Sequence, residues 1–230
     1  MFNKTLFILA SFNLLSLTNN TILSTSLSTP HLAYDNEEIV TVMTPWESQV
    51  EISPYDTLFR TISEREGNDW RLLCAMAYHE SRFQTDVVSH CGARGILQVM
   101  PNVARQFDVS VEQLSNVEDN IYVANRVMAL IDDMLRLPAS VSQEDRLKLT
   151  LAAYNCGIGR VLDARRLARY YGEDSTSWDV VAQYLKKMNL EEYYNQGVVK
   201  YGRFTGAGQT LAYVKNVVNH YNSYCTLAMR

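Results

Sequence analysis

The sequence predicts an all-α fold, and three observations support this prediction. Apolar residues recur every three or four positions through most of the chain after residue 52, a spacing typical of helices. Alternation of apolar and polar residues, typical of strands, is almost absent. The 230 residues are 47% hydrophobic and 20% charged, which suits one domain with a sizeable core. We therefore expect a single folded domain over residues 52–230.

The expected helices follow one another along this domain. The first begins after Ser53-Pro54, a serine cap followed by proline at the first helical position, and it stops at Gly67. Asp69 is the expected cap of the second helix, which is apolar on nearly every side and should lie in the core. The helices are expected at residues 55–66, 70–78, 102–107, 117–137, 144–154, 158–171, 178–185 and 210–227.

The N-terminus predicts an export signal over residues 1–28. Lys4 supplies a basic start, the apolar run 5–17 is too short to span a bilayer comfortably, and a polar stretch follows. Small residues at 24–28 are the expected cleavage region, and 29–51 predict a linker or N-terminal arm. The alternative is an uncleaved signal, which would associate the chain with the membrane.

Charge and cysteine content limit the classes of partner and metal that the chain is expected to bind. The formal net charge is -4 and the two signs are mixed along the chain, so no nucleic-acid partner is expected. The cysteines lack the paired spacing of a zinc site and the histidines are scattered, so no metal site is expected. In an exported protein three complete disulfide pairings remain open, with buried free thiols as the alternative for Cys74 and Cys156. The cysteines are Cys74, Cys91, Cys156 and Cys225.

Glu80 is the candidate catalytic residue. It comes at the end of the apolar second helix, directly after Tyr78-His79. Burial and the negative end of the helix dipole both disfavour a charged carboxylate there, which would raise its pKa toward that of a general acid. The alternative is that Glu80 turns outward at a frayed helix end and pairs with Arg82.

A glycine-punctuated loop, residues 89–101, follows this helix. Gly92 and Gly95 permit tight turns or close approach of another chain. Gln98 carries a donor and an acceptor suited to sugar hydroxyls and amides, and Met100 can pack on a ring face, although an ordinary core role for Met100 is the alternative. The loop is therefore the candidate recognition segment.

Four blocks of the chain form a recognisable set: Glu80-Ser81, Gly95-Ile96-Leu97-Gln98-Val99-Met100-Pro101, Ala153-Tyr154-Asn155-Cys156-Gly157 and Tyr213-Val214. In this order they resemble the soluble lytic transglycosylase-like domain, most closely the catalytic domain of the membrane-bound F type. The resemblance covers residues 53–224 and implies a lysozyme-like helical globule with an active-site cleft. It departs from the family at Leu97, where methionine is usual, and at Gln209, where many members carry a glutamate.

The resemblance also implies an activity and a set of site residues. Glu80 would be the sole acid and base in cutting the β-1,4 bond between N-acetylmuramic acid and N-acetylglucosamine, leaving 1,6-anhydromuramic ends without any cofactor. Asp86 is the only nearby second carboxylate, and nothing in the sequence fixes it to the site. The implied substrate-binding residues are Ser81, Ser89, Gln98, Met100, Tyr154, Asn155 and Tyr213.

These implications complete the expected biology. We expect an exported monomer in the periplasm or cell envelope of a bacterium, with peptidoglycan glycan strands as its partner. Tyr154 is expected to hydrogen-bond and orient Glu80. Two alternatives stay open: a goose-type lysozyme that hydrolyses the same bond with water, and a glycan-binding scaffold without catalysis. Intact Glu80, Gln98 and Tyr154 argue against the scaffold.

Overall fold

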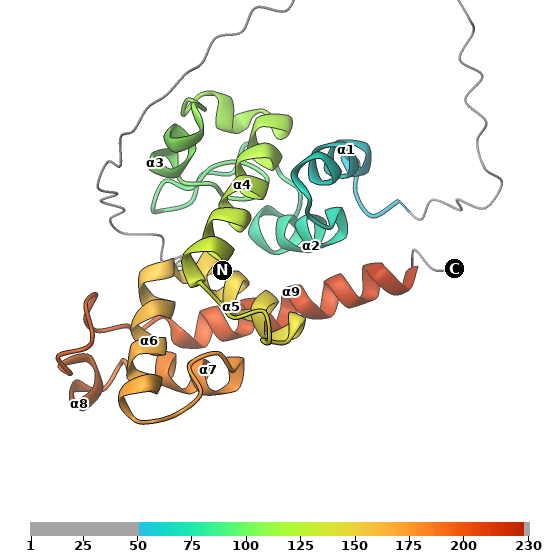
Figure 1. Cartoon of the computed structure of the whole chain (residues 1–230). Coiled ribbons are helices and arrows are strands. Elements are labelled where there is room, and N and C mark those ends of the chain that lie inside the picture. Colours follow the sequence, from blue (N-terminus) through green and yellow to red (C-terminus); the bar gives the residue numbers. More distant parts are fainter. Residues whose placement is uncertain (1–50, 228–230) are drawn as a thin grey trace, which may run out of the picture. The chain divides into compact units, whose positions relative to one another are not determined.

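The structure is a computed structural model that describes residues 51–227, and every regular element in that range is a helix (Figure 1). Two isolated β-bridges, Val88 with Arg94 and Arg94 with Val99, lie in the loop after α2. The all-α prediction is therefore confirmed for these residues. The elements are α1 (Asp56–Glu66), α2 (Trp70–Ser81), α3 (Pro101–Ala104), η1 (Arg105–Phe107), η2 (Gln113–Ser115), α4 (Val117–Leu135), α5 (Gln143–Cys156), α6 (Ile158–Tyr170), α7 (Trp178–Lys187), α8 (Glu191–Tyr194) and α9 (Ala207–Leu227).

The junction between α1 and α2 forms as its residues predict. Gly67 ends α1 with a φ of 75°, the left-handed conformation that glycine adopts without steric cost. Asp69 caps α2, because its side chain accepts a hydrogen bond from the backbone N–H of Arg71. Its carboxylate also pairs with the Arg71 guanidinium at 2.8 Å. The predicted end of the first helix and cap of the second are both confirmed.

The first helix starts one residue later than predicted, at Asp56. The Ser53 hydroxyl accepts a hydrogen bond from the backbone N–H of Tyr55 at 3.2 Å, just ahead of the helix, and not from a residue within it. Instead the Asp56 carboxylate accepts hydrogen bonds from the backbone N–H groups of Ile52 at 2.8 Å and Ser53 at 2.9 Å, and from the Ser53 hydroxyl at 2.7 Å. Because the Ser53 hydroxyl donates to this carboxylate, residues 53–55 form a turn ahead of the helix.

Other boundaries differ by a few residues. The stretch 102–107 divides into the short helix α3 and the 3₁₀ turn η1, α4 ends at Leu135 rather than at 137, and α9 begins at Ala207 rather than at 210. The single turns η2 and α8 were not predicted. Each is too short for apolar periodicity to show in the sequence.

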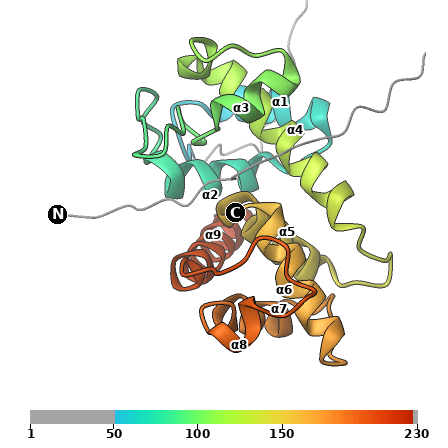
Figure 2. The same ribbon diagram turned by 90° about the vertical axis from the view of Figure 1, so that its left-hand side faces the viewer.

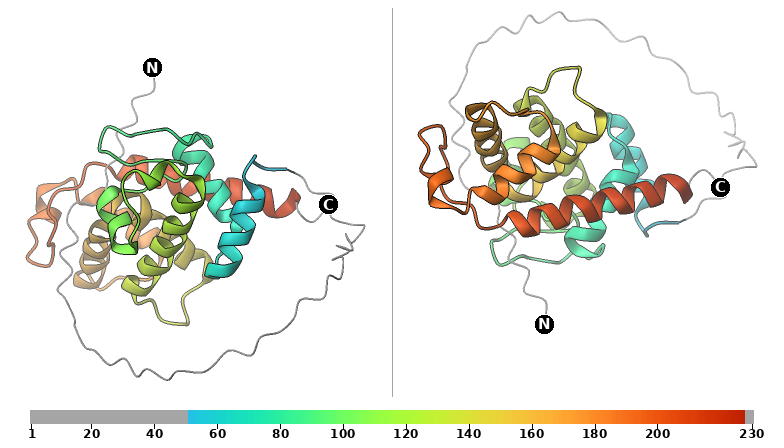
Figure 3. Two further views of the ribbon diagram at one scale, coloured as in Figure 1. Left: turned by 90° about the horizontal axis from the view of Figure 1, so that it is seen from above. Right: turned by 90° about the horizontal axis from the view of Figure 1, so that it is seen from below.

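Packing brings the ends of three helices into one region. Helix α9 packs against both α2 and α5, while α1 packs against α2 and α4. Figure 3 shows α9, in red, crossing the other helices in the view from below. The second helix is buried over Leu72 to Ala77, as its all-apolar sequence predicts. Large side chains in the core include Phe59, Leu73, Met76, Ile121, Leu149, Leu151 and Tyr184.

The predicted export signal lies outside residues 51–227, as does nearly all of the predicted linker. Within the helices that the structure describes, none has both the length and the apolar character needed to cross a membrane.

Candidate active site

Glu80 lies in the last turn of α2 and only 6% of its surface is exposed. Directly after it, Arg82 and Phe83 have φ angles of 58° and 62°, so the chain leaves the helix abruptly. The guanidinium of Arg82 lies 3.9 Å from the centre of the Tyr78 ring. The interpretation of Glu80 as an outward-turned surface residue is therefore wrong, and the expectation of a buried carboxyl is confirmed.

The loop between α2 and α3, residues 82–100, is held by neutral side chains. Ser81 donates its hydroxyl hydrogen to the carbonyl oxygen of Ile96 at 2.8 Å, which ties the loop to the end of α2. Gln98 is buried, and its amide donates to the carbonyls of Val87 and Gly95, both at 3.0 Å. Gln98 also has a φ of 49°, a left-handed conformation uncommon for residues other than glycine. Both side chains thus hold the loop in shape.

Ser89 lies in the middle of this loop and Met100 at its end, and both are half-buried. The Ser89 hydroxyl accepts a hydrogen bond from the backbone N–H of Ala93 at 2.9 Å, which closes the turn through Gly92. Met100 is the residue before the first turn of α3. Their predicted substrate contacts stay predictions.

Asn120 is a loop-positioning residue that the sequence analysis missed. It is fully buried in α4, and it accepts a hydrogen bond from the N–H of Leu97 while donating to the carbonyls of Arg94 and Leu114, each at 2.9 Å. A Cβ atom on Gly95 would lie 2.4 Å from the Asn120 amide nitrogen, so only glycine fits there. The one available signal was an asparagine beside the apolar stripe of the fourth helix.

Tyr154 comes from the last turn of α5, and its hydroxyl donates to the carbonyl of Leu97 at 2.9 Å. Burial raises the pKa of Tyr154 well above its ordinary value, and the negative charge of Glu80 raises it further. The hydroxyl thus keeps its proton and lies near the Glu80 carboxyl. Because a phenol has one proton, Tyr154 is able to accept a hydrogen bond from a protonated Glu80 but not to donate one while it is bonded to Leu97.

Tyr213 reaches the same carboxyl from α9 and is 9% exposed. No hydrogen bond of ordinary geometry reaches its hydroxyl from the residues that the structure describes. The pKa of Tyr213 is raised well above its usual value, mainly by burial and next by the negative charge of Glu80. A weak hydrogen bond toward that carboxylate raises the pKa further. The structure therefore brings Glu80, Tyr154 and Tyr213 together from three helices.

The remaining candidates lie around this centre. Asn155 is half-buried at the end of α5. Gln209 is exposed in the first turn of α9, and Asp86 is exposed on the loop after α2. An exposed loop carboxylate has no fixed position from which to act as a second catalytic group. Glu80 is thus the buried carboxyl around which the site is built.

A pair of histidines connects α2 to α9 beside the site. The Nε2 atom of His79, the residue before Glu80, lies 2.6 Å from the Nδ1 atom of His220. The Tyr78 ring packs edge-on against both imidazoles. These contacts fix the end of α2 that carries Glu80. Nothing in the sequence pattern pairs two histidines that are 141 positions apart.

The four cysteines are free thiols in this structure. Cys74 and Cys156 are buried, which matches the free-thiol alternative. Burial raises the pKa of Cys156 to about 12 and raises the pKa of Cys74 as well. Among residues 51–227, no cluster of three or more histidine, cysteine or acidic side chains could hold a metal ion.

Comparison with known proteins places the chain in a family. The sequence model of the transglycosylase SLT domain family matches residues 57–176. The membrane-bound lytic murein transglycosylase F of Thiobacillus denitrificans is 37% identical over 164 residues, which cover 71% of this chain and 33% of the relative. The corresponding protein of Maricaulis maris is 36% identical over 153 residues, which cover 66% and 32%. The matched part of the chain thus spans about a third of the length of these relatives.

Solved structures give a weaker likeness. The 70 kDa soluble lytic transglycosylase of Escherichia coli is similar with a TM-score of 0.49 and 22% identity, covering 75% of this chain and 24% of that one. The family assignment therefore rests on sequence. The family match over residues 57–176, the relatives above 35% identity and the helical elements confirm the expected lysozyme-like fold class. The chain belongs to the transglycosylase SLT domain family.

Proposed function

We propose that this chain is a peptidoglycan lytic transglycosylase and that Glu80 acts first as its acid and then as its base. The observation that carries the proposal is the buried Glu80 carboxyl with two tyrosine hydroxyls beside it. Membership of the SLT family supports the same activity, and the matched relatives are named lytic murein transglycosylases.

The reaction begins with a proton transfer. The protonated carboxyl of Glu80 gives its proton to the oxygen of the β-1,4 bond between N-acetylmuramic acid and N-acetylglucosamine, and the bond to C1 of the muramic sugar breaks. The 2-acetamido group of that sugar stabilises the positive charge at C1. The hydroxyl of Tyr213 still carries its proton, so it is placed to donate to the Glu80 carboxylate that has just formed.

The second step closes a ring. The Glu80 carboxylate removes the proton from the C6 hydroxyl of the muramic sugar, and the C6 oxygen bonds to C1. The product is a 1,6-anhydromuramic end, water is not consumed, and Glu80 regains its proton. One carboxyl completes both steps, which agrees with the exposed position of Asp86 and with the amide at Gln209.

The products decide between this proposal and hydrolysis. Purified peptidoglycan is digested with the wild type and with Glu80→Gln, and the released muropeptides are weighed by mass spectrometry. We expect anhydro ends, one water lighter than reducing ends, from the wild type. The Gln variant has no proton to give, so its rate should fall by about a thousandfold or more while glycan binding persists. Reducing ends would identify a goose-type lysozyme, and a fully active Gln variant would remove Glu80 from the mechanism.

The cellular setting follows from this substrate. We propose that the protein works in the bacterial cell envelope, where peptidoglycan lies, after export through its N-terminal segment. The domain boundaries at residues 28 and 51 and the monomeric state stay predictions.

A further inference from the structure

A second loop, residues 195–206, connects α8 to α9 and is fixed by charged side chains of α6. Asp163 is fully buried, and its carboxylate accepts hydrogen bonds from the backbone N–H groups of Lys200 at 2.8 Å and Tyr201 at 2.7 Å. Arg160 donates to the carbonyls of Tyr201 and Gly202, and Arg166 donates to that of Val198 at 2.9 Å. These three side chains, which we call the α6 clamp, hold the loop backbone on both sides of Tyr201.

The ring of Tyr201 lies directly against the start of α6. A Cβ atom on Gly159 would lie 2.8 Å from two carbons of this ring, so the glycine lets the ring approach the helix backbone. Even so, 45% of Tyr201 is exposed. One edge of the ring is therefore supported by Gly159, while a large part of the side chain stays exposed.

This ring lies at the catalytic end of its helix. Helix α6 begins immediately after Cys156 and Gly157, the end of the block that supplies Tyr154. Helix α5 packs against both α6 and α9, and α9 carries Tyr213. The start of α6 therefore follows directly on the helix that carries Tyr154 and that packs against the helix of Tyr213.

The two loops also face the same side. Figure 2 shows the loop after α2 and the loop before α9 both on the side turned toward the viewer. In Figure 1 the same two segments lie to the left of α2 and α9. Both connecting loops therefore border one side of the described domain.

We propose that Tyr201 is a substrate-binding residue whose ring packs on a sugar of the glycan strand, away from the sugars flanking the cleaved bond. The inference rests on the proposed function and extends it. An aromatic ring offers a broad apolar face at a low cost in conformational entropy. The C–H face of a pyranose ring matches such a surface. The α6 clamp and Gly159 order the ring before any ligand arrives, which lowers the cost of binding.

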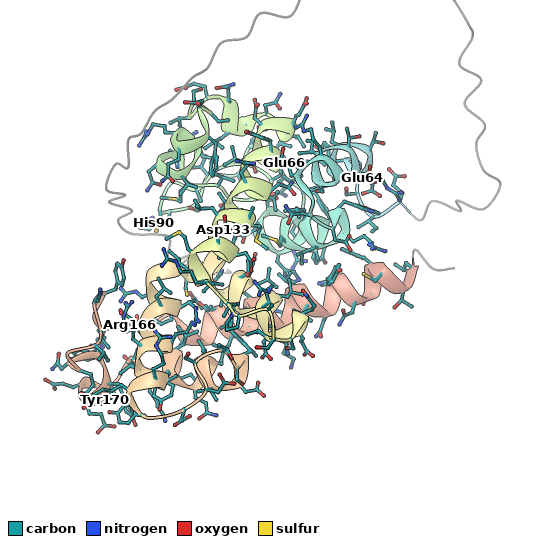
Figure 4. All side chains as sticks on the ribbon, in the orientation of Figure 1. Glu64, Glu66, His90, Asp133, Arg166 and Tyr170 are labelled. Carbon is teal, nitrogen blue, oxygen red and sulfur yellow. The ribbon has the colours of Figure 1, made fainter. Side chains whose placement is uncertain are left out.

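The clamp itself argues against an incidental tyrosine. Burying a carboxylate is unfavourable unless it is fully bonded, and Asp163 is bonded to Arg166 of its own helix and to two backbone N–H groups of one surface loop. Other exposed tyrosines of the described chain are arranged differently. Tyr170, 57% exposed, packs edge-on against Tyr171 at the opposite end of α6 (Figure 4). Tyr170 is therefore the control, because it is also exposed but lies at the other end of α6.

The experiment compares Tyr201→Ala, Tyr201→Phe and Tyr170→Ala on glycan strands of defined length. For Tyr201→Ala we expect kcat/KM to fall about fivefold on long strands through a higher KM, with little change in kcat, which is the order of one lost aromatic contact. The loss should shrink on strands too short to reach the ring. Tyr201→Phe should retain the wild-type value because the ring does the packing, and Tyr170→Ala should match the wild type. An unchanged KM in Tyr201→Ala would overturn the inference.

A second readout separates this inference from the proposed function. Affinity for glycan strands is measured in the Glu80→Gln background, with and without Tyr201→Ala. Weaker binding on loss of Tyr201 supports the inference. This holds even if the wild type yields no anhydro ends, because missing anhydro ends would contradict only the proposed function. Unchanged binding, with normal cleavage by the wild type, removes only the inference.

Gly159→Ala tests the supporting surface. The added methyl group must push the ring aside, so this variant should lose affinity as Tyr201→Ala does, and adding it to Tyr201→Ala should cause no further loss. Gly208→Ala is the control, because a Cβ atom on Gly208 meets nothing within 4 Å. Additive losses from the two substitutions would contradict the proposed packing.

Discussion

The two loops on the face of the site are held in opposite ways. The loop after α2 is fixed by the hydroxyls and amides of Ser81, Gln98, Asn120 and Tyr154, all of them neutral. The loop before α9 is fixed by the charged α6 clamp. The neutral anchors are buried around Glu80, where an added charge would be costly and would disturb the catalytic carboxyl. The charged anchors lie farther along the chain from it, in the first turns of α6. The two loops thus differ in the charge of the side chains that hold them.

The largest effect should come from removing the central neutral anchor. Asn120→Ala deletes three buried hydrogen bonds and leaves the N–H of Leu97 without its partner, so we expect a loss of about 4 kcal/mol in the free energy of unfolding. Cleavage of peptidoglycan should fall with it. Urea denaturation measures the change. Asn125→Ala, also buried in α4 but with one side-chain hydrogen bond, is the control and should cost far less; equal losses would refute the special role of Asn120.

The next effect tests how closely the neutral loop fits. Gly95→Ala places a methyl group against Asn120 and Leu114 at a φ of 75°, and we expect it to cost about 3 kcal/mol. Gly92→Ala has a similar φ of 88° but meets nothing within 4 Å, so it should show only the backbone penalty of about 1 kcal/mol. Thermal unfolding of both variants measures the difference. Equal losses of stability in the two variants would show that the contact with Asn120 does not constrain residue 95.

The charged loop should respond more mildly. Asp163→Asn keeps one acceptor for the loop N–H groups but removes the charge that pairs with Arg166, and we expect a loss of about 2 kcal/mol. KM for long glycan strands should rise while the mass of the products stays the same. Asp179→Asn, at an exposed site in α7, is the control. A change in kcat without a change in KM would show that this loop reaches the chemistry itself.

The smallest effect concerns pH. Because the pKa of Tyr154 and of Tyr213 is raised in the folded chain, their protonated forms stabilise the fold below about pH 10, the unfolded pKa of tyrosine, and this contribution is lost as the pH rises above it. Ultraviolet absorbance should show a late-ionising group of tyrosines. Tyr154→Phe and Tyr213→Phe should each shrink that group. Glu80→Gln should lower both pKa values while leaving them above normal, since burial is the larger cause.

The two loops also differ in how far the sequence predicts them. Glu80 and the loop after α2 were predictable because a single apolar helix ends in a carboxyl, and glycines at 92 and 95 follow closely in sequence. Asn120 was missed because its partners lie 6 to 26 positions away, where no periodicity connects them. Tyr154 was expected to orient Glu80 directly. In the structure the Tyr154 hydroxyl instead donates its hydrogen bond to the carbonyl of Leu97, 57 positions away, a contact that only the fold creates.

The sequence gives almost no indication of how the loop before α9 is held. Nothing in the sequence singled out Asp163 or Arg166, because the burial of Asp163 depends on a loop 37 positions later. The one-turn helix α8 and the turn at Ser53 were misjudged for a related reason, since local hydrogen bonds of single side chains outweigh propensity in such short segments. Periodicity therefore predicts which helices form, and long-range pairing decides how the connections between them are held.

The amide of Asn120 has a consequence for how the site moves. It joins the loop after α2 to the middle of the fold, so that the loop and the start of α4 should open as one cooperative unit rather than separately. The entropy of ordering this loop is then lost when the chain folds, before any glycan arrives. The binding energy of the strand remains available for distorting the sugar ring and aligning it with Glu80.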